Sequence, residues 1–301
     1  MIKVYCKKED SEVPLELRKE LFPSGESKFI LEGLVDLDKT NQANEKITIN
    51  WKFENEGVDF LDLMVLLHSE QVQSFKKKVL YIPYLPFMRM DRNNGNKELI
   101  VSANAMLDIL KGAPVDDILV GTLHSQLNER DYIKEITLEN NLYEKIAEDL
   151  ESKGFTVIPV FPDKGAQERQ AKLSAKGETT PWLNTMHITA DKIRNFETGK
   201  IEKITANVPN HTKKLLESNE KTALVIIDDI CSYGGTFIGV KEAIQAEVKH
   251  DSLHVLCVAH LEEVAFKGKV TDEFDVVLAT DSLLKQEVPE TNAEIIIVKT
   301  I

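Results

Sequence analysis

The chain has 301 residues, enough for one large domain or two of ordinary size. Its 50 acidic and 37 basic residues give a formal net charge of −13, which argues against a nucleic-acid-binding protein. No stretch approaches the roughly 20 apolar residues of a membrane helix, and the three cysteines show neither disulfide-type nor zinc-type spacing. Because the N-terminus also lacks a secretory signal pattern, we expect a cytoplasmic protein that binds neither nucleic acid nor membrane.

Short apolar runs rich in β-branched residues alternate with amphipathic segments. The runs predict buried strands and the segments predict helices. In chain order the predicted elements are helix 60–75, strand 79–83, helix 102–111, strand 118–122, helix 142–153, strand 156–160, helix 166–175, strand 223–227, helix 235–247 and strand 253–259. This alternation is typical of α/β proteins with parallel sheets.

The pattern of strand, turn and helix runs twice, with a joint near Lys153-Gly154. We therefore expect two α/β domains, residues 1–153 and 154–301, each a mainly parallel sheet flanked by helices. Residues 176–211 contain polar clusters without a clean period, which predicts a flap in the second domain.

The strongest motif follows the predicted strand 223–227. Two carboxylates, Asp228 and Asp229, stand at its C-terminal end, and Gly234-Gly235-Thr236 leads into a helix. Ligands bind at this edge of an open parallel sheet, and paired glycines let backbone N–H groups approach a phosphate. Acids beside a phosphate would repel it unless they hold sugar hydroxyls or Mg²⁺. The motif therefore predicts a sugar-phosphate site, whereas a simple helix cap would not require the two acids.

This motif resembles the phosphoribosyl pyrophosphate loop of the type I phosphoribosyltransferase fold. Further segments extend the resemblance over nearly the whole chain, to the ribose-phosphate diphosphokinases, also called phosphoribosyl pyrophosphate synthetases. These segments are FPSGE at 22–26, YIPYLPFMRMDR at 81–92, TLH at 122–124, PDKG at 162–165 and DKIR at 191–194. The resemblance implies two tandem phosphoribosyltransferase-like domains, with ATP bound on the side of the first and the ribose-phosphate loop and catalytic flap in the second.

On the ATP side, the resemblance implies binding by Phe22, Ser24, Glu26, Arg89, Met90 and Asp91. In the family the segment matching 22–26 reaches into a neighbouring subunit to hold adenine, which implies a homo-oligomer, a dimer or a hexamer. Ser24 stands where the family generally has an acid, and Met90 replaces a usual amide. Without the resemblance, residues 22–26 are a loop between strands and the charges around Arg89 are a solvated cluster.

The resemblance also implies catalytic roles for Lys192, Arg194 and His124, and a Mg²⁺ site that involves His124 and Asp163. The acceptor's ribose phosphate would be bound by Asp228, Asp229, Ser232, Tyr233, Gly234, Gly235 and Thr236. Taken alone, a single histidine is more often structural, and Asp163 could be an ordinary turn residue.

The implied reaction transfers the β,γ-diphosphoryl group of MgATP to the anomeric C1 hydroxyl of ribose 5-phosphate, giving phosphoribosyl pyrophosphate and AMP for nucleotide biosynthesis. Ser232 and Tyr233 depart from the acid and threonine of the family loop. They suit an acceptor whose 5-phosphate carries a further group, such as ADP-ribose in NAD metabolism, although drift in a synthetase with the ordinary acceptor would look the same. A simple phosphoribosyltransferase and an inactive regulatory homologue are also compatible with the loop.

Overall fold

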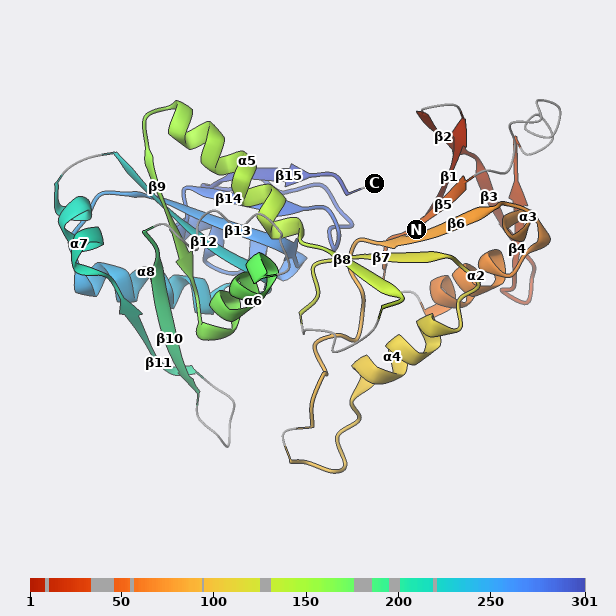
Figure 1. The fold of residues 1–301 in the computed structure, drawn as a ribbon, viewed down its shortest axis with the longest axis horizontal. Coiled ribbons are helices and arrows are strands. Elements are labelled where there is room, and N and C mark those ends of the chain that lie inside the picture. Colours follow the sequence, from red (N-terminus) through yellow and green to blue (C-terminus); the bar gives the residue numbers. More distant parts are fainter. Residues whose placement is uncertain are drawn as a thin grey trace. The chain divides into compact units, whose positions relative to one another are not determined.

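The computed structural model describes residues 1–8, 11–33, 46–54, 57–93, 95–124, 131–175, 186–194, 201–218 and 221–300. The chain divides into two compact units, residues 1–136 and 137–300 (Figure 1). The division lies one helix before the joint expected at Lys153-Gly154. The reason is helix α5 (Leu138–Ser152), whose buried residues Leu142, Ile146 and Leu150 pack in the core of the second unit.

The first unit is built on a six-stranded sheet with the strand order β2-β1-β5-β6-β7-β8. Its strands are β1 (Ile2–Lys8), β2 (Ser11–Leu15), β5 (Lys46–Trp51), β6 (Lys77–Ile82), β7 (Asp117–Gly121) and β8 (Ile133–Ile136). Strands β5 to β8 run parallel, and β1 pairs antiparallel with β2 and β5. Strands β3 (Leu17–Leu21) and β4 (Ser27–Leu31) form a separate hairpin, and the helices are α2 (Gly57–Leu67), α3 (Glu70–Gln73) and α4 (Ser102–Lys111).

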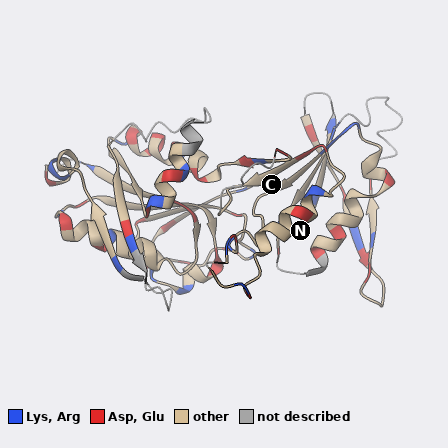
Figure 2. Ribbon diagram, turned by 60° about the horizontal axis from the view of Figure 1, so that its bottom comes forward, with Lys and Arg blue, Asp and Glu red and all other residues tan. Residues whose placement is uncertain are grey.

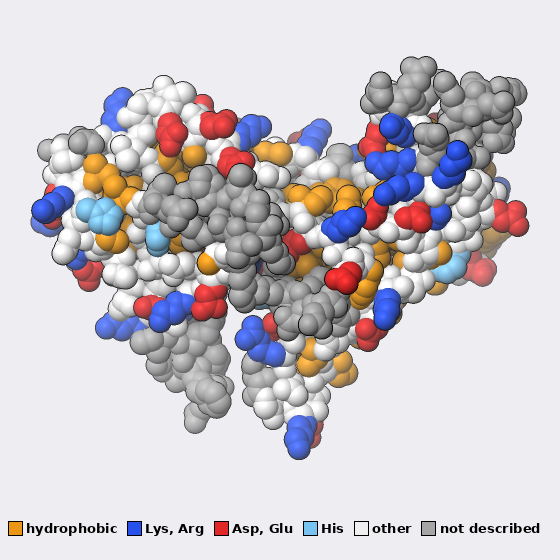
Figure 3. Space-filling model, viewed as in Figure 1, with side chains coloured by type: hydrophobic (Ala, Val, Ile, Leu, Met, Phe, Trp, Pro, Cys, Tyr) orange, Lys and Arg blue, Asp and Glu red, His pale blue; other side chains and the backbone are white. Residues whose placement is uncertain are grey.

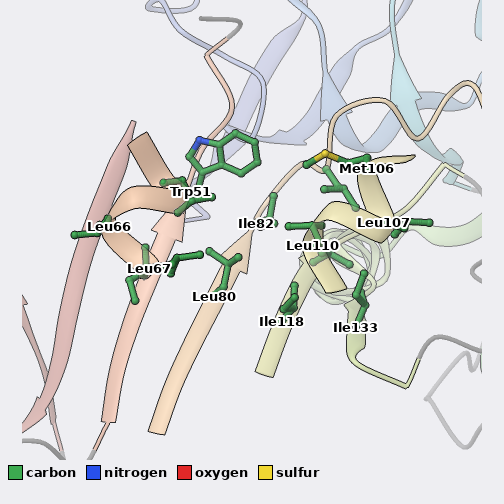
Figure 4. Packing of buried hydrophobic residues seen from close by; sticks show 14 of the residues in the cluster. Trp51, Leu66, Leu67, Leu80, Ile82, Met106, Leu107, Leu110, Ile118 and Ile133 are labelled. Atoms are coloured by element: carbon green, nitrogen blue, oxygen red, sulfur yellow. The ribbon is translucent and has the colours of Figure 1, made fainter. Parts of the chain in front are cut away.

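The core of the first unit joins its sheet to α2 and α4 (Figure 4). Leu80 and Ile82 of β6 are fully buried, together with Leu67 of α2 and Leu110 of α4. The helix predicted over 60–75 is in fact two helices. Ser69 separates them because its hydroxyl accepts a hydrogen bond from the Val72 N–H at 3.3 Å and so caps α3.

The second unit is built on a seven-stranded sheet with the order β11-β10-β9-β12-β13-β14-β15. Its strands are β9 (Thr156–Phe161), β10 (Ile188–Arg194), β11 (Ile201–Asn207), β12 (Thr222–Cys231), β13 (Leu253–Leu261), β14 (Val276–Thr280) and β15 (Glu294–Val298). All neighbouring pairs are parallel except β10 and β11. With α5, its helices are α6 (Lys164–Ala175), α7 (Asn210–Glu217), α8 (Gly235–Glu247), η2 (Glu263–Lys267) and α9 (Val270–Glu273).

The central strand β12 is covered on both faces. Leu224 and Ile226 share a core cluster with residues of α8, whereas Val225 and Ile227 share another with residues of α5. Because side chains alternate along a strand, this pattern explains the continuous apolar run that predicted a buried strand.

The predicted fold class is confirmed, since each unit is a mainly parallel sheet flanked by helices. Within the predicted flap, β10 and β11 form an antiparallel pair, and residues 176–185 and 195–200 of the flap lie outside the described residues.

The described surface mixes charges and apolar side chains. Acidic and basic positions are interspersed along the ribbon of both units (Figure 2). On the face drawn in Figure 3, hydrophobic side chains form several separate groups. None of the helices in the described part of the chain is both long and apolar enough to span a bilayer.

Two neighbouring histidines of the second unit have pKa values below the usual range. The rings of His250 and His254 lie 5.3 Å apart. Burial lowers the pKa of His254 to about 4, helped by the positive charge of Lys241 and by His250 and opposed by Asp275. Burial also lowers the pKa of His250. The His254 ring is therefore neutral in the folded chain near pH 6.5, where histidines of the unfolded chain take up protons, and the His250 ring takes up its proton at lower pH than in the unfolded chain.

We expect the free energy of unfolding to fall as the pH falls from about 6.5 to about 4, because the unfolded chain binds more protons over this range. For His254 alone the loss is about 3 kcal/mol, given a pKa that drops from 6.5 to about 4. Urea unfolding at pH 7.5 and pH 4.5 measures the difference. His254→Gln should reduce this difference in the free energy of unfolding. Equal pH dependence in the variant and the wild type would show that His254 is not its source.

Candidate functional site

Three neighbouring parallel strands of the second unit carry candidate site residues at their C-terminal ends, and those after β9 and β12 were predicted from the sequence. Asp163 follows β9, residues 228–236 lead from β12 into α8, and Glu262 follows β13. The carboxyl ends of parallel strands meet at one edge of a sheet, where ligands of open α/β folds bind. The chain order thus gathers these residues at one edge.

The turn Gly234-Gly235-Thr236, here called the glycine turn, has a backbone conformation that requires glycine at residue 234. Gly234 has a φ of +79°, and a Cβ atom there would lie 1.7 Å from Cγ2 of Val270. Helix α8 begins at the next residue, Gly235. The first N–H groups of a helix have no partner within it and carry partial positive charge. The turn therefore provides the backbone donors and the positive potential that a phosphate needs.

The two adjacent acids differ in their surroundings. Asp229 is 4% exposed, and its Oδ2 lies 3.7 Å from Nη2 of Arg169 on α6. Asp228 is only half-buried, and its Oδ1 accepts a hydrogen bond from the Asp229 N–H at 2.9 Å. Desolvation of the Asp228 carboxyl group and the nearby Asp229 carboxylate raise the pKa of Asp228 well above its usual value, against the opposing charge of Arg169. Because Asp228 is half-buried and Asp229 is almost fully buried, a ligand can reach Asp228 more readily.

Lys192 links two of the strand ends. Its side chain on β10 is 13% exposed, and Nζ lies 3.6 Å from Oδ2 of Asp163. The same Nζ donates to Oγ1 of Thr236 at 3.4 Å. The structure thus brings three predicted site residues together around one ammonium group. Arg194 is the last residue of β10, and its side chain lies outside the described residues.

The loop between β12 and α8 is tied to the end of β13. The Ser232 hydroxyl donates to Oε2 of Glu262, and the Glu262 N–H donates to the Cys231 carbonyl at 2.9 Å. Tyr233 is 65% exposed. Neither Glu262 nor Arg169 was predicted from the sequence. The position of Glu262 just after the predicted strand 253–259 was a signal that could have found it.

In the first unit, two predicted residues of the ATP side follow neighbouring parallel strands. Arg89 lies in the segment after β6, and His124 comes three residues after β7. Both residues are exposed, as is Met90. Asp91 binds the guanidinium of Arg92 through both carboxylate oxygens, at 3.1 Å each. This edge therefore presents a cation and an imidazole, the groups that a triphosphate site uses.

The remaining predicted ATP residues form the turn between β3 and β4. The Gly25 N–H donates to the Phe22 carbonyl at 2.8 Å, and the Phe22 N–H donates to the Glu26 carbonyl at 2.9 Å. The Ser24 hydroxyl donates to Oε2 of Glu26 at 2.7 Å. Phe22 is 52% exposed, so its ring is available for stacking.

The described residues contain no cluster of three or more histidine, cysteine, aspartate or glutamate side chains arranged to bind a metal ion. Mg²⁺ commonly uses one or two carboxylates and takes its other ligands from water and substrate phosphates. Asp163 and Asp228 lie at one sheet edge and offer carboxylate oxygens as metal ligands. The Asp229 carboxylate beside Asp228 adds negative charge, which a bound cation would compensate. These residues fit a magnesium ion held largely by substrate. His124 lies in the other unit and offers nitrogen, which Mg²⁺ favours less.

No family model matches the chain. Three curated proteins named ribose-phosphate pyrophosphokinase are similar to it. The protein of Sulfurisphaera tokodaii is 25% identical over 245 residues, covering 81% of this chain and 76% of the relative. Those of Saccharolobus solfataricus and Pyrococcus abyssi are 25% and 27% identical, each covering 75% of this chain and 70% and 69% of the relative.

Among solved structures, the phosphoribosylpyrophosphate synthetase of Mycobacterium smegmatis matches with a TM-score of 0.64 and 15% identity. The match covers 95% of this chain and 86% of that one, which confirms the expected fold. The chain is thus similar to ribose-phosphate pyrophosphokinases over 69–76% of their length, at 25–27% identity, and shares its fold with a solved phosphoribosylpyrophosphate synthetase.

Proposed function

We propose that the protein is a diphosphokinase that transfers the β,γ-diphosphoryl group of MgATP to the anomeric C1 hydroxyl of a ribose 5-phosphate unit and releases AMP. The observation that carries this proposal is the position of Lys192, whose ammonium group contacts both Asp163 and Thr236. A cation between an acid that would bind the sugar and the first turn of a helix that would bind its phosphate supports a role in stabilising negative charge on a transferred diphosphoryl group. The names of the curated relatives support the same reaction.

In this reaction the C1 oxygen attacks the β-phosphorus in line, and the bond between the β-phosphorus and the bridging oxygen breaks. AMP leaves with that oxygen, and the proton of the C1 hydroxyl passes to solvent. Phosphoryl transfer needs positioning and charge stabilisation more than a strong nucleophile. Lys192 would stabilise the negative charge that develops on the transferred group. Asp228 would hold the ribose hydroxyls, and the glycine turn would bind the 5-phosphate.

Arg194 and His124 would act on the triphosphate, as the family resemblance implies, while Arg89 binds it and Phe22 and Glu26 hold the adenine. Asp163 and Asp228 would hold a magnesium ion, which when bound neutralises phosphate charge and orients the oxygens.

Two compounds are candidate acceptors of the diphosphoryl group, ribose 5-phosphate and ADP-ribose. The curated relatives are named for ribose phosphate. A 5-phosphate that carries a further group, as in ADP-ribose, is favoured by Tyr233, because its exposed ring adjoins the glycine turn and offers a stacking surface that an unsubstituted phosphate would not use.

The test is a competition assay. The purified protein receives MgATP and equal amounts of ribose 5-phosphate and ADP-ribose, AMP release is followed, and the diphosphorylated product is identified by mass. We expect AMP with one diphosphorylated acceptor dominating. Absence of AMP with either acceptor would overturn the proposal and favour an inactive regulatory homologue.

A further inference from the structure

An acid is built into the loop that would hold the acceptor's phosphate. Glu262 immediately precedes the short helix η2, yet its side chain makes no capping hydrogen bond to that helix. Instead its carboxylate accepts a hydrogen bond from the hydroxyl of Ser232, the first residue after β12. The Glu262 N–H binds the Cys231 carbonyl at 2.9 Å, which fixes residue 262 beside the loop independently of the side chain.

This contact changes what the loop can bind. A serine hydroxyl has one proton to donate, and Ser232 donates it to Glu262 and not toward the phosphate site. The loop thereby loses one donor and acquires a neighbouring carboxylate. A terminal phosphate carries about −1.5 to −2 charges at pH 7, whereas a phosphate esterified on a second oxygen carries about one. Because repulsion grows with the charge and falls with distance, what matters is the charge on the phosphate that lies in the loop. The Glu262 carboxylate therefore disfavours a terminal phosphate there more strongly than an esterified one, whose second charge lies farther away on the next phosphate.

The residue after Ser232 adds a surface for a substituent. The backbone of Tyr233 is closely packed, since a Cβ atom on Gly268 would lie 2.7 Å from the Tyr233 carbonyl oxygen. Its side chain is nevertheless 65% exposed. A fixed backbone with an accessible aromatic ring is a platform on which a base or sugar beyond the phosphate can stack.

We infer that Glu262, acting through Ser232, and Tyr233 together select the acceptor. They favour a ribose whose 5-phosphate is esterified, as in a nucleoside diphosphate ribose, over a ribose that ends in a free phosphate. This inference rests on the proposed function and narrows its substrate class.

The test removes the charge and keeps the hydrogen bond. Glu262→Gln retains an oxygen that can accept from Ser232, so the loop is preserved while the negative charge is lost. We expect the ratio of kcat/KM for ribose 5-phosphate to that for ADP-ribose to rise about tenfold, in line with the removal of one nearby charge. Glu263→Gln is the matched control, because it removes the same charge one residue away and keeps an acceptor for the Lys285 N–H. It should leave the ratio unchanged.

The second variant is Tyr233→Ala. We expect a rise of about tenfold in KM for ADP-ribose and little change for ribose 5-phosphate. Equal ratios in the wild type and Glu262→Gln, or equal losses for both acceptors in Tyr233→Ala, would overturn the inference.

Calorimetric titration of each acceptor into the ATP-free protein separates this inference from the proposed function. Tighter binding of ADP-ribose than of ribose 5-phosphate, with the preference reduced in Glu262→Gln, supports the selection even if no AMP is released in the competition assay. Tighter binding of ribose 5-phosphate by the wild type refutes it, whatever the turnover.

Discussion

Lys192→Met is expected to lower kcat by roughly 10²–10³-fold, the usual effect of removing one donor that stabilises transition-state charge. The ammonium group is almost buried between Asp163 and Thr236, and a neutral side chain in its place would carry no compensating charge. The unbranched methionine side chain keeps the apolar contacts of the lysine stem. Steady-state AMP release at saturating substrates measures the effect.

Lys203→Met is the matched control. Lys203 is an exposed residue of β11, the strand paired with β10. Lys203→Met is therefore the same substitution as Lys192→Met in the same pair of strands, but at a residue outside the candidate site. Its kcat should stay within about twofold of the wild type, as for other exposed substitutions. Equal kcat values for Lys192→Met and the wild type, with unchanged circular dichroism, would show that Lys192 does not act in the transfer.

Gly234→Ala is expected to destabilise the second unit by about 2–5 kcal/mol. Part of the loss is the left-handed backbone, which costs a residue with a Cβ atom about 1–2 kcal/mol, and part is the overlap of that atom with Val270, since overpacking costs about 1–3 kcal/mol. The φ of +79° and the 1.7 Å separation are the two causes. Urea unfolding gives the change in free energy.

Two further variants separate the causes. Gly235→Ala should be nearly neutral in stability, because a Cβ atom there meets nothing within 4 Å and the position is helical. Adding Val270→Ala to Gly234→Ala removes the atom that clashes, so the double variant should lose less stability than the sum of the single variants. Strict additivity would mean that the backbone conformation alone requires the glycine.

Periodicity predicted those elements whose pattern is local. Helix α4 has the predicted limits 102–111 because its buried positions, such as Ala103, Met106 and Leu110, recur at helical spacing. Strand β12 was predicted from its apolar run, although it extends to Cys231. The strands β1 to β4 were not predicted, because most of their residues are exposed or half-buried and give no continuous apolar run.

The candidate site was predictable where a residue follows a recognisable strand or lies in a motif, as with Asp163 and the loop from Asp228 to Thr236. The contacts that these residues make with other parts of the chain could not be predicted from the sequence. Arg169 comes to Asp229, and Glu262 to Ser232, only when separate strands and helices pack, and their separation of 60 and 30 residues leaves no periodic signal. The same packing gives different surroundings to two acids, Asp228 and Asp229, that look equivalent in the sequence.

Because the second unit begins at Thr137, the choice of the first residue matters when this unit is expressed as a separate fragment. A fragment that begins at residue 154 lacks α5 and leaves the apolar side chains of Val225, Ile227 and Val255 without their covering helix. Such a bare sheet face invites aggregation. Cutting before Thr137 keeps that helix with the strands it covers, so the natural place for a fusion junction is the short link between β8 and α5.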